Sequence, residues 1–218
     1  MKMNIASGSL WVAYTLTDPQ TIQSMLPPSL RLTSCSLLDD ERSTFPTPKL
    51  LFNAYRVDAG AFMQGMRTDV LTLAQNRRTG KRHLVMLDCL TDTMQWDPIH
   101  GVRCPNARVY EPLRVSANDF ALVVTNNHNL FRLRATRSVE RPINNVFAVE
   151  ANLACYYKTS NEAYPMSFDN DTISRPVRQL NPYDHVNTYW CHVRSPFPSH
   201  TFCHEHPMTF DVKISSFR

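Results

Sequence analysis

Short segments that alternate apolar and polar side chains, each closed by a polar turn, constrain the fold of this chain more than any other feature. The clearest example is residues 68–76 and 83–91, which flank the turn sequence RRTGKR. Alternation with a period of two is typical of a β-strand, and two such segments joined by a tight glycine-containing turn are typical of a hairpin. The sequence therefore predicts antiparallel strand pairing as the main structural device.

The same alternation predicts further strands along the chain. Residues 17–26 differ: Thr17-Asp18-Pro19 places a capping side chain before a proline, and Ile22, Met25 and Leu26 follow at helical spacing. We therefore expect an α+β fold of mainly antiparallel strands, a closed or nearly closed β-barrel with a few short peripheral helices, in a single domain over residues 1–218. The other expected strands are residues 10–16, 30–38, 49–57, 120–125, 129–139, 145–158 and 207–214.

Composition and charge restrict the class of protein. With 43% hydrophobic and 19% charged residues, the chain has the composition of a packed globule. The net charge of +4 is too mild to indicate a nucleic-acid partner. The start lacks a signal-like apolar segment and no apolar run reaches the length of a membrane span, so we expect no membrane partner and a cytoplasmic location. The cysteines form no C-x-x-C pair, which favours free thiols.

The stretch HTFCHEHP contains three histidines of the same parity, His200, His204 and His206. An extended backbone would place them on one face, as a three-histidine metal site requires. Packed or solvated histidines in a proline-bounded surface loop are the favoured interpretation. We therefore expect no metal and no cofactor.

The N-terminal run SLWVAYTLTDPQTIQSMLPPSLRL resembles the opening of the acetoacetate decarboxylase family. That family also has a strand ending in a tyrosine, a Thr-Asp pair, a short helix and a proline-marked exit into the next strand. KLLFNAYRV resembles its second barrel strand, MRTDVLTLA a strand carrying one of its acids, and HLVMLDCL the strand before its catalytic lysine loop. The resemblance covers about residues 9–110, roughly half of the chain.

The resemblance implies a decarboxylase that forms a Schiff base to a lysine following a proline. Here Pro105 is followed by Asn106 and Ala107, so the imine-forming amine is absent. The family's arginine falls near Leu16, and its two glutamates fall on Asn53 and Arg67. The chain has only five lysines, none in that loop. The resemblance therefore predicts the fold but not the lysine chemistry.

The segment DPIHGVRCPNARV, residues 97–109, falls where the catalytic loop belongs. The interpretation as a pocket wall bearing His100, Arg103, Cys104 and Asn106 stands beside a simpler one, in which these residues only stabilise a turn. Both interpretations of residues 97–109 are open on the sequence.

Arg67 is the only formal charge among the four exchanged family positions, and a lone pocket cation would prefer an anionic ligand or a developing oxyanion. Asp69 is its candidate partner, in which case Arg67 would act mainly as a structural counter-ion. The expected catalytic residues are Arg67, His100 and Asn53, and the expected ligand-binding residues are Asn106, Arg103, Tyr55 and Asp69.

Three functions remain open on these residues. The first is a lysine-independent lyase, isomerase or cyclase acting on a small carbonyl or carboxylate compound, which could be polyketide-like. The second is a non-catalytic protein that binds an apolar carboxylate. The third is a surface-interaction protein using the arginine-rich strand in NLFRLRATR. A small-molecule ligand is the expected partner, and assembly into a homo-oligomer is left open.

Overall fold

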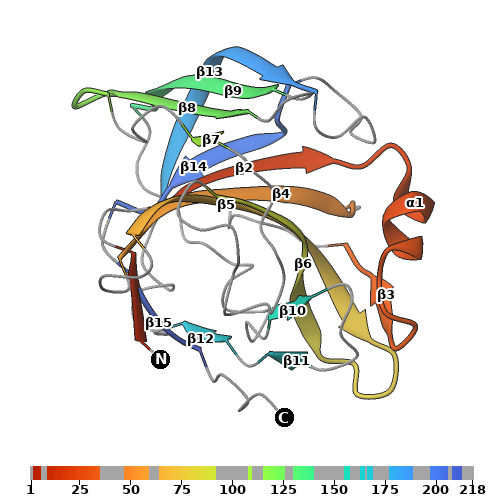
Figure 1. Ribbon diagram of the computed structural model, residues 1–218. Coiled ribbons are helices and arrows are strands. Elements are labelled where there is room, and N and C mark those ends of the chain that lie inside the picture. Colours follow the sequence, from red (N-terminus) through yellow and green to blue (C-terminus); the bar gives the residue numbers. More distant parts are fainter. Residues whose placement is uncertain are drawn as a thin grey trace.

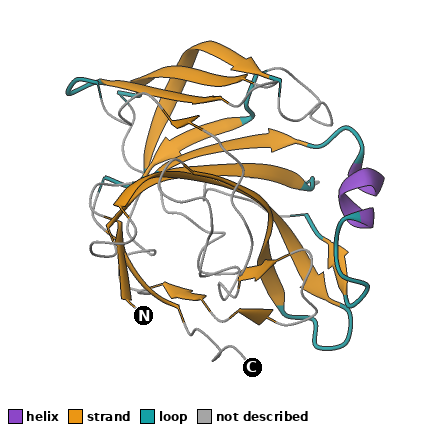
Figure 2. Ribbon diagram, viewed as in Figure 1, coloured by secondary structure: helices purple, strands orange, loops and turns teal. Residues whose placement is uncertain are grey.

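The computed structural model describes residues 2–5, 9–34, 47–58, 64–91, 108–109, 115–125, 130–139, 155–157, 163–164, 166–168, 177–188, 197–205 and 208–212. Almost all of the regular structure in these ranges is β-strand, with a single short helix (Figure 2). The elements in chain order are β1 (Lys2–Ile5), β2 (Leu10–Thr15), α1 (Pro19–Ser24), β3 (Leu30–Leu32), β4 (Lys49–Asp58), β5 (Gln64–Asn76), β6 (Arg82–Thr91), β7 (Arg108–Val109), β8 (Asp119–Thr125), β9 (Leu130–Arg137), β10 (Cys155–Tyr157), β11 (Ala163–Tyr164), β12 (Met166–Phe168), β13 (Arg178–Asn187), β14 (His200–Cys203) and β15 (Met208–Val212).

The described strands form one 15-stranded sheet. Its main path runs β11-β10-β6-β5-β4-β2-β14-β13-β9-β8-β7, while β1 joins β4 to β15 and β12, and β3 pairs with β5. Figure 1 shows the sheet curling from β4 through β6 towards β10 and, on the other side, from β1 towards β12. No pairing between described strands joins the two ends of this path, so the expected α+β, mainly antiparallel fold is confirmed but the described sheet is not a closed barrel.

The hairpin of β5 and β6 matches the prediction from RRTGKR. The two strands pair from Gln75↔Arg82 to Arg67↔Thr91. The turn places Gly80 at φ 71°, a left-handed conformation that glycine adopts without steric cost. Its amide donates to the carbonyl of Asn76 at 2.9 Å. The turn chemistry therefore fixes the register of the strands that carry Arg67 and Asp69.

The main hydrophobic core lies between two layers, β8, β9 and β13 on one side and β2, β4, β5 and β6 on the other (Figure 1). Phe52 of β4 and Phe131 of β9 stack across it with ring centroids 4.9 Å apart. Alternation sends every second side chain of β4 and β5 into this core and the remaining side chains to the opposite face. That opposite face carries the candidate site.

The predicted helix is confirmed as α1, on the right of Figure 1. Asp18 caps it by accepting a hydrogen bond from the Thr21 amide at 3.2 Å, and Pro19 occupies its first turn. Ile22 is its buried residue. The helix carries no charged residue that acts on the site.

Several strand predictions were incomplete. β13 (RQLNPYDHVN) and β14 (HTFC) are not among the expected strands, and HTFC is a strand with three buried residues rather than a surface loop. β13 is mostly half-buried and contains Pro182 at an irregularity in its pairing with β9, so neither alternation nor apolar content marks it. β3 ends at Leu32, earlier than expected. Of the expected strand at 145–158, the structure describes only Cys155–Tyr157.

Candidate functional site

A row of directly paired residues crosses the sheet on the face opposite the main core. Phe202 of β14 pairs with Trp11 of β2, Trp11 with Asn53 of β4, and Asn53 with Asp69 of β5. Tyr55 and Arg67 form the next pair along β4 and β5. Because directly opposed residues of an antiparallel pair project to the same face, these six side chains form one continuous surface. All six are buried.

The polar half of this surface is a hydrogen-bonded ion pair. Arg67 Nε donates to Asp69 Oδ1 at 2.7 Å, and the Tyr55 hydroxyl donates to Asp69 Oδ2 at 2.6 Å. Arg67 and Asp69 are 4% and 2% exposed, so the two charges lie in a low-dielectric environment where each needs the other. Arg67 is therefore not a lone cation. Of the two roles that the sequence left open for Arg67, the structure shows the pairing with Asp69. A ligand would therefore contact an ion pair that carries no net charge.

Asn53 is the unusual member of the row. It is 2% exposed, and its Oδ1 has no hydrogen-bond partner among the described residues. An unpaired buried acceptor costs about 1–3 kcal/mol, and unpaired polar groups of this kind are rare in folded proteins. A ligand that brings an O–H or N–H group to Asn53 would relieve that cost.

The other half of the surface is aromatic. The rings of Trp11 and Phe202 are stacked with centroids 6.1 Å apart, and the His204 ring packs edge-on against both. The Trp11 indole N–H donates to Ser9 Oγ at 2.8 Å, which satisfies its polar atom and leaves the ring faces for packing. We call the stacked rings of Trp11 and Phe202 the aromatic shelf. An apolar surface of this kind beside a polar cluster suits a ligand with an apolar part and a few oxygen atoms.

Sequence reasoning missed the aromatic shelf and one further contact. Arg67 Nη2 lies 3.6 Å from the sulfur of Met86, which is a weak acceptor. Alternation in LWVAYT does place Trp11 opposite the core face of its strand, so its signal was present. Phe202 was hidden because HTFC was interpreted as a loop.

Of the seven predicted site residues, the structure brings Asn53, Tyr55, Arg67 and Asp69 together. His100, Arg103 and Asn106 lie outside the described residues. Leu16, at the family's arginine position, is buried in the main hydrophobic core and belongs to the other face of the sheet.

Lys49 lies on the same strand as Asn53 and Tyr55. It is the first residue of β4, it is 5% exposed, and its parity matches that of Asn53. Lys81, by contrast, is exposed at the hairpin turn. Because Lys49 is buried on the strand that carries Asn53, a test for imine formation must examine it in particular.

The histidine cluster is divided between different environments. His204 is buried against the aromatic shelf, while His200 lies on β14 with Nδ1 3.2 Å from Ser199 Oγ. His206 lies outside the described residues. Within the described part of the chain, no group of three or more His, Cys, Asp or Glu side chains is placed to hold a metal ion.

The arginine-rich strand is β9, and its charges are partly matched. Arg132 pairs with Asp184 of β13 at 3.0 Å. Arg137 pairs with Glu205, which also lies 3.8 Å from Arg178. Such partly exposed pairs neutralise part of the positive surface that an interaction role would need. In the described residues, no helix is long and apolar enough to cross a membrane.

Comparison with known proteins supports the fold. No protein-family model and no curated protein matches the sequence. Three solved structures are similar over nearly the whole chain. This structural similarity shows a shared fold, that of acetoacetate decarboxylase, and at such low sequence identities it shows the fold alone. The three structures are acetoacetate decarboxylase from Legionella pneumophila subsp. pneumophila str. Philadelphia 1 (13% identity, 99% of this chain and 88% of that chain, TM-score 0.61), the enduracididine biosynthesis enzyme MppR complexed with pyruvate (12%, 100% and 91%, 0.54) and an acetoacetate decarboxylase-like enzyme from Sphingomonas wittichii RW1 (7%, 97% and 89%, 0.52).

Proposed function

We propose that this chain, which has the fold of acetoacetate decarboxylase, binds a small carbonyl or carboxylate compound at Asn53 and the Arg67–Asp69 pair and acts on it as a lysine-independent lyase, isomerase or cyclase. The observation that carries the proposal is the unpartnered Oδ1 of Asn53 beside the buried ion pair. A ligand hydroxyl or enol would donate to Asn53, and the Arg67 guanidinium would face a ligand oxygen. MppR, a protein of the same fold, binds pyruvate.

The aromatic shelf defines the other end of the ligand. Trp11 and Phe202 offer a planar apolar surface next to Asn53, which suits an aromatic or polyketide-like ring. In a reaction, the Arg67 guanidinium, which Asp69 holds in place, would donate to a carbonyl oxygen of the ligand. It would stabilise the negative charge that develops on that oxygen, since fixed donors in a dry site need no reorganisation. The absent family lysine supports a mechanism of this kind over an imine.

A second candidate function, the non-catalytic binder, is favoured by a specific observation. Both carboxylate oxygens of Asp69 already accept hydrogen bonds, and the Tyr55 hydroxyl donates to one of them. Within the described cluster, these groups are committed to one another rather than set to move a proton. If His100 does not supply the base, binding without turnover is the expected behaviour.

The test uses purified protein and a panel of 1,3-dicarbonyl and hydroxy-acid compounds, with binding measured by calorimetry and turnover by mass spectrometry. The key variant is Asn53→Leu, which keeps the branching of the side chain but removes its polar atoms. Its matched control is Thr68→Val, because Thr68 also has a buried oxygen without a hydrogen-bond partner in the described part of the chain but projects to the opposite face of β5.

Asn53→Leu should weaken binding about tenfold or more, equivalent to about 1.4 kcal/mol, while Thr68→Val leaves it unchanged. Equal binding by wild type and Asn53→Leu would refute the site. Turnover separates the enzyme from the binder. Borohydride trapping with acetoacetate should add no mass to any lysine; an adduct mapped to Lys49 would overturn lysine independence.

A further inference from the structure

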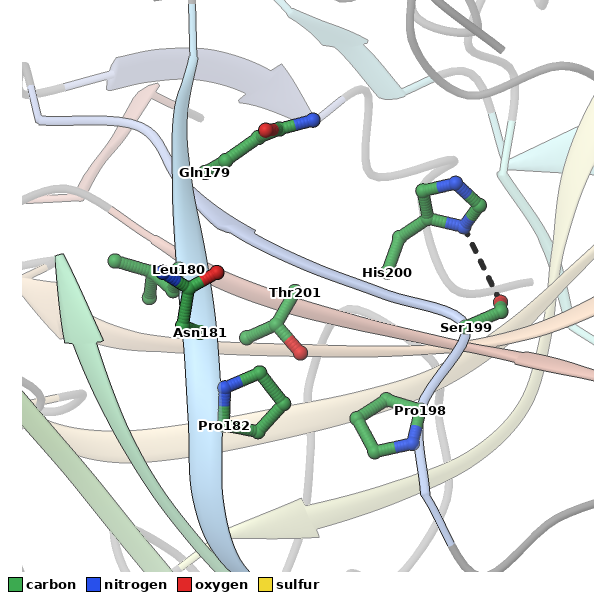
Figure 3. A pocket seen from close by; sticks show the side chains of 8 residues that line it. All are labelled: Gln179, Leu180, Asn181, Pro182, Pro198, Ser199, His200 and Thr201. Carbon is green, nitrogen blue, oxygen red and sulfur yellow. Dashed lines mark hydrogen bonds between the residues drawn. The ribbon is translucent and has the colours of Figure 1, made fainter. Parts of the chain in front are cut away.

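The structure contains a second candidate site, a pocket of about 230 Å³ between β13 and β14, shown in Figure 3. The two strands pair only at Arg178↔Cys203 and Gln179↔Phe202. Beyond Gln179, β13 pairs with β9 while β14 continues along β2, so the strands separate and leave a wedge between them. The pocket occupies this wedge, where the sheet passes from one layer to the other.

Prolines border the wedge on both sides. Pro182 lies on β13 at the irregularity in its pairing with β9, and Pro198 precedes β14. Figure 3 shows the two rings on opposite sides of the opening. Since proline has no amide hydrogen, neither residue can donate a backbone hydrogen bond across the gap, which disfavours further pairing of the strands.

The wall of the wedge carries an unpartnered polar atom. Thr201 is 4% exposed, its hydroxyl has no hydrogen-bond partner among the described residues, and it lines the pocket between the two prolines (Figure 3). Burial of a hydroxyl without a partner costs about 1–3 kcal/mol. Figure 3 shows this oxygen directed towards the gap between the two proline rings, at the wall of the pocket rather than inside a close-packed core.

The remaining polar groups define the chemistry of the ligand. The amides of Gln179 and Asn181 offer both donors and acceptors, and the described residues that line the pocket include no Asp, Glu, Lys or Arg. The Ser199 hydroxyl donates to the Ala13 carbonyl at 3.0 Å, so at the 3.2 Å contact with His200 it is Nδ1–H that donates. Neutral His200 therefore has Nε2 as an acceptor.

We infer that the wedge between β13 and β14 is a binding site for a small uncharged amide, held by the hydroxyl of Thr201 and the side-chain amides of Gln179 and Asn181. The volume of about 230 Å³ lies below the range of about 300–1,000 Å³ that is typical of drug-sized ligands, which suits a smaller compound such as one amino-acid amide. This site is separate from Asn53 and Arg67 and does not depend on the proposed function.

The test compares N-acetylglycinamide with N-acetylglycine, which differ mainly by the charge of the carboxylate. Binding at pH 8 is followed by amide chemical shifts of β13 and β14. The neutral compound should bind and shift Gln179, Asn181 and Thr201, with the anion at least tenfold weaker because the described lining offers no Lys or Arg as a counter-ion. Absence of shifts in β13 and β14 at the solubility limit of the amide, or tighter binding of the anion, would overturn the inference.

Thr201→Val should weaken the neutral compound about tenfold without lowering the melting temperature, since the substitution removes an unpaired hydroxyl and little volume. Thr68→Val is the matched control, because the Thr68 hydroxyl is also buried, has no partner within the described ranges, and does not line the pocket. Should Thr201→Val fail to fold, Asn181→Ala replaces it, since Asn181 is exposed. Unchanged affinity in the folded variant, or an equal loss in Thr68→Val, would refute the site.

Discussion

Arg67 and Asp69 project from the same face of β5 and form an ion pair with Nε 2.7 Å from Oδ1, both side chains being almost completely buried. Tyr55 lies beside the pair, and its hydroxyl donates a hydrogen bond to the second carboxylate oxygen of Asp69. This arrangement gives the site a dipole rather than a net charge. A ligand is therefore recognised by directed hydrogen bonds and not by attraction of an anion to a free cation.

The buried pair predicts a strongly non-additive response to mutation. Arg67→Met should lower the free energy of unfolding by about 3–5 kcal/mol, because it leaves the Asp69 carboxylate buried without its counter-ion. Combining Arg67→Met with Asp69→Leu should recover most of that loss, since a buried pair replaced by apolar residues of similar size is often neutral. Urea unfolding of the two single variants and the double variant measures the coupling. Additive losses would show that the two charges act independently.

Tyr14 predicts the alkaline limit of stability. It is buried in the main core, its hydroxyl is hydrogen-bonded to His185, and burial raises its pKa above the ordinary value, an effect partly offset by the polar side chain of Asn187. With the folded pKa above the unfolded one, the folded state retains the proton as pH rises. Stability should therefore be lost progressively above about pH 10.

Tyr14→Phe tests this relationship because the variant cannot ionise. We expect it to be less stable than wild type at pH 8 by about 1 kcal/mol, the usual value of one hydrogen bond. The difference between the two proteins should shrink as pH rises above about 10. Urea unfolding of both proteins from pH 8 to pH 11 measures it, and parallel curves would contradict the assigned pKa shift.

Much of the fold was accessible from the sequence because local chemistry specifies it. The turn around Gly80 fixed the β5–β6 register, Asp18 and Pro19 fixed the start of α1, and alternation in KLLFNAYRV placed Asn53 and Tyr55 on one face. The site half on β4 and β5 followed from these. β13 and β14 were missed because their residues are held by partners distant in sequence, β9 and β2, and neither strand carries a clear local pattern. Trp11 pairs with Phe202, so the aromatic shelf depended on a strand that the sequence did not reveal.

His83 predicts a loss of stability on the acid side. It is 7% exposed on β6, and burial, followed by the positive charge of Lys81, lowers its pKa below the ordinary 6.5. The folded state therefore holds the neutral ring while the unfolded chain takes up a proton. The contribution is fully present above about pH 6.5 and falls as pH drops towards the folded pKa.

Urea unfolding from pH 5 to pH 7 should show a shallower dependence on pH for His83→Gln than for wild type. Lys81→Ala provides the complementary measurement, since removing its charge should raise the pKa of His83 in an NMR titration while leaving burial unchanged. A wild-type His83 pKa at or above 6.5 would exclude this explanation.

Arg67→Lys separates recognition from stability at the candidate site. The ammonium keeps a counter-ion for Asp69, so the melting temperature should fall much less than in Arg67→Met. It cannot reproduce the planar guanidinium, which bonds Asp69 through Nε and contacts Met86 through Nη2 from one rigid group. Binding or turnover should therefore fall about tenfold or more, in line with the ~1.5–3 kcal/mol typical of hydrogen bonds to charged groups. The control is Arg132→Lys, because Arg132 also pairs with an aspartate but lies partly exposed on β9, and that variant should match wild type in both measurements. If Arg67→Lys leaves binding intact while the melting temperature falls as far as in Arg67→Met, Arg67 serves the fold, and ligand recognition must rest on Asn53 and the aromatic shelf.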